Sequence, residues 1–199
     1  KGTHYIGFAD EPNLNYSSFE QYRAIFASMA RQVRSGDPDN LEAQGARKYW
    51  GLLMGSLFRR DQQADGINAL LNYGYTVLRA ATARAVVAAG LHPSLGLHHS
   101  HDNNAMRLVD DLMEPFRPVI DLTVWHLQSS GPCAVNPDTK RALVQSPYQD
   151  LPTDSGRTPV LVAVQKLAIS LAQVQLGERK ALDLPWPGVP LLQVPDLDD

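Results

Sequence analysis

Residues 66–89, GINALLNYGYTVLRAATARAVVAA, decide the fold class of this chain. Apolar side chains recur at three- and four-residue spacing, which places them on one face of an α-helix. They are Ile67, Leu70, Leu71, Tyr75, Leu78, Ala81, Ala85 and Val86. Alanines fill the spaces between them and favour close packing on neighbouring helices. Gly90 follows directly, as is typical of a helix end. The stretch therefore predicts a long central helix.

The same periodicity continues on both sides of this stretch. It predicts further helices over residues 18–35, 40–54, 105–127, 137–144 and 159–176. Pro115 either lies in the first turn of a new helix or kinks a continuous one. No convincing alternating strand is visible. We expect an all-α fold, with a multi-helix catalytic domain over residues 18–184, an irregular segment over 1–17 and a Pro-rich acidic tail over 185–199.

Length and composition narrow the class of protein. A chain of 199 residues with 44% hydrophobic residues can bury a sizeable core as one domain. Its single cysteine, Cys133, excludes an internal disulfide and a zinc cage of cysteines, and it suggests a reducing compartment. No apolar run approaches the roughly 18 residues of a membrane span. We expect a cytoplasmic protein without a membrane partner.

The charge is unevenly distributed along the chain. A net charge of −3 argues mildly against nucleic acid as a partner. Residues 23–84, however, carry nine basic and five acidic residues. The local charge decides whether a phosphate backbone can dock, although the same pattern is also typical of ordinary solvated helices.

Two clusters of side chains could carry chemistry. Four histidines, at positions 92, 98, 99 and 101, fall within one predicted loop. Downstream, Asp111 and Glu114 are three residues apart and share a helix face. Paired carboxylates with one imidazole suit Mg²⁺ or Mn²⁺. A structural alternative stays open, in which the two acids form a capping box before Pro115.

Glu42 has a similar alternative. By spacing alone, it is the third-residue partner of an N-cap at Asp39, and the capping interpretation is the simpler one.

Four segments, taken in order, resemble a known family, the CRISPR-associated adaptation integrases (the Cas-one family) in their type II form. The segments are EAQGARKYW at 42–50, GINALLNYGY at 66–75, GLHPSLGLHH at 90–99 and DDLMEPFRP at 110–118. Several long motifs in the right order are far more specific than one short motif. The resemblance is to the family's helical domain and covers about residues 35–127.

The resemblance implies a reaction and a metal site. Family members capture short double-stranded DNA and insert it into a CRISPR array by transesterification, and many also act as metal-dependent endonucleases. Their metal ligands correspond here to Glu42, His99 and Glu114, with Asp111 beside them as a further catalytic residue. The expected cofactor is Mg²⁺ or Mn²⁺. His98 is one residue early for the histidine motif.

The resemblance also implies partners and DNA contacts. Arg117 matches a basic position that contacts DNA in the family. Asn72 and Tyr73 could orient the scissile phosphate, whereas Tyr75 is more typical of a core position. Further phosphate contacts are expected at Arg59, Arg60 and Arg84. The implied partners are prespacer DNA, the CRISPR repeat, a second copy of the chain as a homodimer, and a Cas-two dimer.

The sequence departs from the family at its front. Members begin with a β-rich domain of several dozen residues, and none is recognisable after Lys1. We therefore expect the family's C-terminal helical domain, as a fragment or as a protein rebuilt at its front. Two alternatives remain: a non-catalytic helical fragment that binds DNA or a partner, and an unrelated metal hydrolase built on the histidine cluster.

Overall fold

The computed structural model describes residues 5–6, 16–34, 36–98, 103–131, 134–153, 156–185 and 192–193. It divides into two compact units, residues 6–61 and residues 62–199 together with 1–5, and each unit is described by itself. Helices dominate both, so the predicted all-α class is confirmed. The segment boundaries expected at residues 17 and 184 stay predictions.

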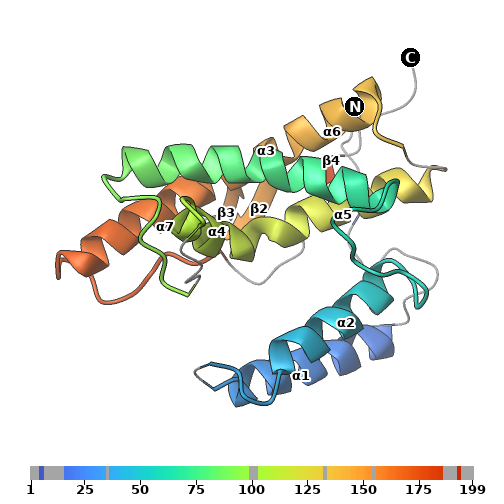
Figure 1. Ribbon diagram of the computed structural model, residues 1–199, viewed down its shortest axis with the longest axis horizontal. Coiled ribbons are helices and arrows are strands. Elements are labelled where there is room, and N and C mark those ends of the chain that lie inside the picture. Colours follow the sequence, from blue (N-terminus) through green and yellow to red (C-terminus); the bar gives the residue numbers. More distant parts are fainter. Residues whose placement is uncertain are drawn as a thin grey trace. The chain divides into compact units, whose positions relative to one another are not determined.

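The smaller unit is a helical hairpin of α1 (Tyr16–Gln32) and α2 (Leu41–Leu53), which pack on each other (Figure 1). Asp37 caps the start of α2, because its two carboxylate oxygens accept the backbone N–H groups of Leu41 and Glu42 at 2.8 Å each. Asp39 instead forms an ion pair with Arg34 at 2.7 Å. The capping-box interpretation of Asp39 and Glu42 is therefore wrong.

The larger unit is built around α3 (Ile67–Ala88). Four helices pack against it (Figure 1): α4 (Arg107–Met113), α5 (Arg117–Ser129), α6 (Pro137–Gln145) and α7 (Val160–Gln175). The predicted apolar face of α3 lies in the core, where Leu70, Leu71 and Val86 are fully buried. Removing this apolar surface from water is the main source of the unit's stability.

Helix α3 ends at Ala88, just before Gly90, as the sequence predicts. Gly90 has a φ of 77°, a conformation that glycine adopts without strain. The N–H groups of Gly90 and Leu91 bind the carbonyl oxygens of Val87 and Val86, at 3.0 and 3.1 Å. These two hydrogen bonds end the helix, and the chain continues into the histidine-containing loop.

Pro115 lies between two helices. It belongs to the 3₁₀ turn η2 (Glu114–Phe116), which joins α4 to α5. Proline is tolerated there because the first N–H groups of a helical turn have no partner within it. Of the two alternatives for Pro115, the structure thus supports a break between two helices, and the turn presents Glu114 between them.

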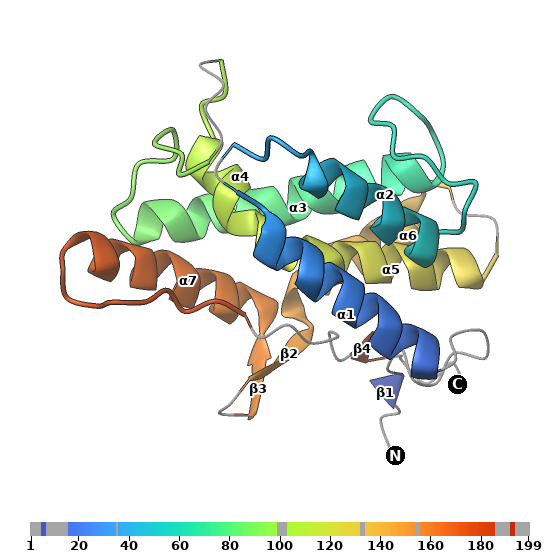
Figure 2. The same cartoon turned by 90° about the horizontal axis from the view of Figure 1, so that it is seen from below.

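The structure also contains a short β-hairpin that the sequence pattern did not predict. Strands β2 (Asp150–Thr153) and β3 (Gly156–Pro159) form an antiparallel hairpin that leads into α7 (Figure 2). The 3₁₀ turn η3 (Ser146–Tyr148) precedes it, and two-residue strands occur as β1 (Tyr5–Ile6) and β4 (Leu192–Gln193). Short strands containing proline lack the alternation that marks a strand in sequence.

In the part of the chain that the structure describes, none of the helices has the length and apolar character needed to cross a membrane.

Candidate metal and DNA site

The loop between α3 and α4 is fastened to the start of α4 through its backbone. The N–H of Leu108 donates to the carbonyl oxygen of Pro93 at 2.8 Å. The Nε of Arg107 donates to the carbonyl oxygen of Ser94 at 2.9 Å. These bonds satisfy backbone groups that a loop cannot pair within itself. The first half of the loop is therefore held against the helix.

Asp111 holds the next part of the same loop. Its Oδ2 accepts the backbone N–H groups of Leu97, at 2.6 Å, and His98, at 3.2 Å. Hydrogen bonds to an ionised carboxylate are stronger than those between neutral groups. The loop is thus fixed up to His98. His99, the predicted metal ligand, lies outside the described residues.

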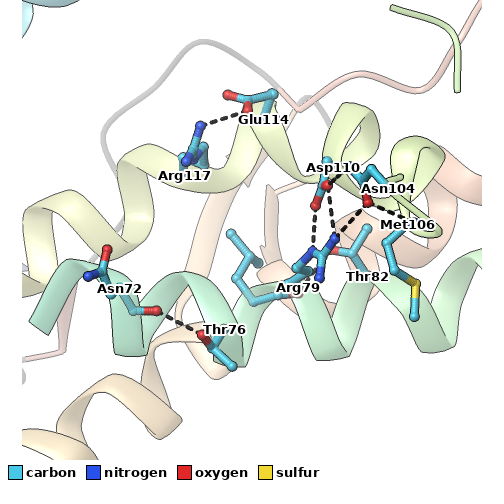
Figure 3. A network of polar contacts seen from close by, with 10 residues as sticks. Asn72, Thr76, Arg79, Thr82, Asn104, Met106, Asp110, Glu114 and Arg117 are labelled. Carbon is cyan, nitrogen blue, oxygen red and sulfur yellow. Dashed lines mark hydrogen bonds and ion pairs between the residues drawn. The ribbon is translucent and has the colours of Figure 1, made fainter. Parts of the chain in front are cut away.

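The far end of the loop is held by Asp110 and Arg79 (Figure 3). Arg79 of α3 donates to the two carboxylate oxygens of Asp110 at 2.6 and 3.0 Å. Asn104 donates to Asp110 at 2.7 Å and accepts from Arg79 at 3.2 Å and from the Met106 N–H at 2.9 Å. The hydrogen bond to Asp110 raises the pKa of Arg79, against an opposing effect of burial. This cluster ties α3, α4 and the loop together.

Glu114 is exposed on η2 and is paired with Arg117. Nη1 of Arg117 donates to Oε1 of Glu114 at 2.7 Å (Figure 3). Burial on its own would lower the pKa of the Arg117 guanidinium, but the charge of Glu114 leads the effects that raise it overall. Because Asp111 binds the loop and Glu114 binds Arg117, neither acid caps the turn at Pro115, and the capping-box alternative for this pair is wrong.

Beneath Arg117 lies Tyr75 of α3. The guanidinium carbon of Arg117 is 4.4 Å from the centre of the Tyr75 ring, a cation–π distance. The Tyr75 hydroxyl donates to the carboxylate of Asp121, which is 3% exposed. Tyr75 is itself buried, which confirms the core position expected for it. Asp121 could not be selected from the sequence, where it is marked only as an acidic residue within an apolar stretch.

The remaining predicted ligand, Glu42, belongs to the smaller unit. It is exposed in the first turn of α2, where its backbone N–H is capped by Asp37. Among the described residues, its carboxylate has no hydrogen-bond or ion-pair partner.

The predicted DNA contacts are distributed over both units. In the smaller unit, Arg59 and Arg60 donate to backbone carbonyl groups close to them in the chain. On α3, Asn72 donates to the Gln62 carbonyl oxygen at 2.9 Å, and the Tyr73 ring lies 5.6 Å from the Lys140 ammonium. The sixth predicted contact is Arg84, which is exposed on the same helix.

The predicted ligands are of the chemical kinds that a hard or borderline divalent cation takes. Two exposed carboxylates and one imidazole form the kind of ligand set that Mg²⁺ or Mn²⁺ takes. Within the described ranges, which omit His99, no three His, Cys, Asp or Glu side chains are grouped to hold a metal ion. Glu42 and Glu114 belong to different units and are described separately.

Comparison with known proteins gives the context of these residues. The family model described as "CRISPR associated protein Cas1" matches residues 13–139, which include every predicted ligand. A "CRISPR-associated endonuclease Cas1" of Neisseria meningitidis is 37% identical over 164 residues, covering 81% of this chain and 53% of the relative. A "CRISPR-associated endonuclease Cas1 1" of Methanospirillum hungatei is 40% identical over 117 residues, covering 58% of this chain and 33% of that protein. The chain thus spans about half the length of the Neisseria relative and about a third of the length of the Methanospirillum relative.

A solved structure shares the fold. The structure titled "Casposase bound to integration product" superimposes with a TM-score of 0.65 at 24% sequence identity. The likeness covers 77% of this chain and 54% of the casposase chain.

Proposed function

The chain belongs to the Cas1 family, and we propose that it is a divalent-metal-dependent DNA endonuclease and integrase of CRISPR adaptation. The observation that carries this proposal is the match of the family model over residues 13–139. That range contains Glu42, the loop with His99, and the turn that presents Glu114.

In the proposed site, Glu42, His99 and Glu114 hold Mg²⁺ or Mn²⁺. When bound, the ion polarises a phosphoryl oxygen and lowers the pKa of the attacking hydroxyl. In integration, a DNA 3′-hydroxyl oxygen forms a new bond to phosphorus as one existing P–O bond breaks, so the number of phosphodiester bonds is unchanged. In cleavage, water replaces the 3′-hydroxyl group as the nucleophile.

The other residues serve this reaction by position and by charge. The guanidinium of Arg117 lies beside Glu114, where a cation stabilises the negative charge that develops on the phosphate. Asp111 serves by holding the backbone that leads to His99. Arg59, Arg60, Arg84, Asn72 and Tyr73 contact the DNA backbone in this proposal.

We propose the same partners that the family resemblance implies. They are prespacer DNA, the CRISPR repeat, a second copy of the chain and a Cas-two dimer. The single cysteine is consistent with action in the cytoplasm.

The direct test is DNA cleavage and strand joining by the chain with Mg²⁺ or Mn²⁺. We expect Glu42→Ala, His99→Ala and Glu114→Ala each to abolish both reactions. The matched control is Glu178→Ala, which removes another exposed carboxylate, just after α7, and should leave both rates unchanged. Thermal unfolding of each variant establishes that loss of activity is not loss of fold.

The alternatives give different results. Loss of activity in His98→Ala but not in His99→Ala would show that the histidine ligand is misassigned. Salt-dependent DNA binding without cleavage by any divalent ion would favour a non-catalytic DNA-binding fragment. Zinc-dependent hydrolysis of small esters or peptides would favour an unrelated hydrolase.

A further inference from the structure

We propose that Asp121 is a positioning residue, which acts through Tyr75 to hold Arg117 and thereby the exposed carboxylate of Glu114. This inference rests on the proposed function, since it concerns the ligand and the cation of that site. Three contacts join the four residues: Asp121 to Tyr75, Tyr75 to Arg117, and Arg117 to Glu114. They link α3 to the start of α5 and to η2.

The burial of Asp121 is the first argument. Its neighbours on α5, Ile120 and Val124, are fully buried, and Asp121 itself is 3% exposed. A buried carboxylate is costly unless it is hydrogen-bonded and balanced by a positive charge. Replacing a whole buried polar or ionic group of residues by apolar side chains of similar volume is often neutral or stabilising. Core packing alone therefore does not account for an acid here.

The Tyr75 ring is the second argument. Its hydroxyl is fixed by Asp121, so the ring cannot rotate away without breaking a buried hydrogen bond. The ring face then forms a platform for Arg117, with the guanidinium carbon 4.4 Å from its centre. Cation–π contacts contribute most where water is excluded, as it is at this buried ring.

The state of Arg117 is the third argument. Its Nε is buried without a hydrogen-bond partner in the described part of the chain, an arrangement that is energetically unfavourable. Its position is therefore imposed by the groups around it: the Tyr75 ring, the Glu114 carboxylate and the charge of Asp121. Arg117 and Asp121 are also four residues apart and share one face of α5.

A consequence follows for the proposed site. Arg117 is held from beneath, so its Nη1 group reaches Glu114 from a fixed direction. If the support is lost, the guanidinium can move toward solvent and Glu114 loses its orientation. In many metal sites, residues that hold a ligand without touching the metal orient that ligand. Their loss lowers metal affinity or activity about 10–100-fold.

The test follows the Arg117 side chain directly by NMR of arginine Nε–H groups. In the wild type, the Arg117 Nε–H is expected to be shifted upfield by the Tyr75 ring current and to exchange slowly. Asp121→Leu removes the hydrogen bond and the charge, but replaces a buried acid with an apolar side chain. We expect it to lose most of the upfield shift and to exchange faster, and thermal unfolding establishes that the variant is folded. The Arg79 Nε–H, bonded to Asp110, is the internal control and should not change.

Two further variants separate positioning from packing. Asp121→Asn keeps an oxygen that accepts from Tyr75, so it should restore part of the shift lost in Asp121→Leu. Tyr75→Phe keeps the ring and the charge of Asp121 but removes the same hydrogen bond, so it should lose part of the upfield shift. The double variant should go no further than Asp121→Leu alone, because that substitution already removes the hydrogen bond.

The second part of the test measures the activity of the same variants. We expect kcat to fall about tenfold in Asp121→Leu, with partial rescue in Asp121→Asn. An unchanged Arg117 signal in Asp121→Leu and Tyr75→Phe, or a change that the Arg79 signal matches, would overturn the positioning role. If the wild-type protein shows no metal-dependent cleavage or joining of DNA, the proposed function is wrong. The NMR measurement would still decide whether Asp121 positions Arg117.

Discussion

At the scale of single residues, Gly74 shows how closely the helices of the larger unit approach. A Cβ added there would overlap Cγ2 of Ile120 on α5 and lie 3.1 Å from Cδ2 of Leu143 on α6. The absence of a side chain at this point lets three helices meet around one position. Gly45 of α2 differs, since a Cβ there would meet only Cε of Met29, at an ordinary 3.7 Å.

The same substitution at these two glycines should have opposite effects. Gly74→Ala is expected to destabilise the protein by about 1–3 kcal/mol through overpacking. Gly45→Ala is expected to stabilise it by about 0.5–1 kcal/mol, because alanine is the better helix former and the space is available. Denaturant unfolding of the two variants measures both effects. A Gly74→Ala protein as stable as the wild type would show that α5 and α6 yield at this contact.

Single residues also show where sequence reasoning succeeds and where it stops. The periodic spacing of Tyr75 with Leu71 and Leu78 placed it in the core correctly, since periodicity determines which helix face is buried. No such rule selects its partner. Asp121 is 46 residues away, and its bond to Tyr75 depends on how α3 and α5 pack.

At the scale of elements, α4 is a short helix whose two acids fasten the preceding loop. Asp111 binds the backbone at Leu97 and His98, and Asp110 binds Asn104 together with Arg79 of α3. Like charges side by side repel, so each acid benefits from its own set of donors. The pair therefore fixes both sides of the loop that contains the proposed histidine ligand.

Removing the Asp111 carboxylate should loosen only one side of that loop. In Asp111→Ala, the amide hydrogens of Leu97 and His98 lose their acceptor and should exchange with solvent about tenfold faster or more. The amide of Leu108 keeps its bond to the Pro93 carbonyl oxygen and is the matched control. Equal acceleration at all three amides would mean that Asp111 supports the whole loop and α4, and not this segment alone.

Some features of the helices could be predicted from the sequence and others could not. The helix end at Gly90 and the long helices followed from residue type and spacing, which act locally. The cap of α2 did not, because Asp37 reaches Leu41 and Glu42 from a backbone conformation with a φ of 41°. A positive φ at a residue other than glycine is uncommon, and the sequence gives little sign of it.

At the scale of the whole molecule, the distribution of charge is expected to affect DNA binding more than the net charge does. The chain has a net charge of −3, yet its predicted DNA contacts include four arginines spread over both units. Arg84 is exposed on α3, whereas Arg141, also exposed, is paired with Asp138 on α6 at 3.3 Å. These two arginines therefore provide a matched test of the proposed DNA contacts.

The salt dependence of DNA binding should distinguish them. Each phosphate contact on a duplex contributes about −0.9 to the slope of log K against log salt concentration. Arg84→Gln should therefore weaken binding and reduce the magnitude of the slope by about one, whereas Arg141→Gln should change neither. Fluorescence anisotropy over a salt series measures the slope. Identical slopes for wild type and Arg84→Gln would remove Arg84 from the interface.

The sequence by itself determined the helical class, the order of the helices and the motifs that the family comparison matched. These follow from local spacing and residue type, which a linear chain states directly. Only the tertiary structure decided that Asp37 caps α2, that Asp111 holds the loop, and that Asp121 lies beneath Tyr75 and Arg117. The Asp37 cap depends on an unusual local backbone conformation. The other two pairings depend on how packing brings together residues that are distant in the chain, and spacing along the sequence encodes neither kind.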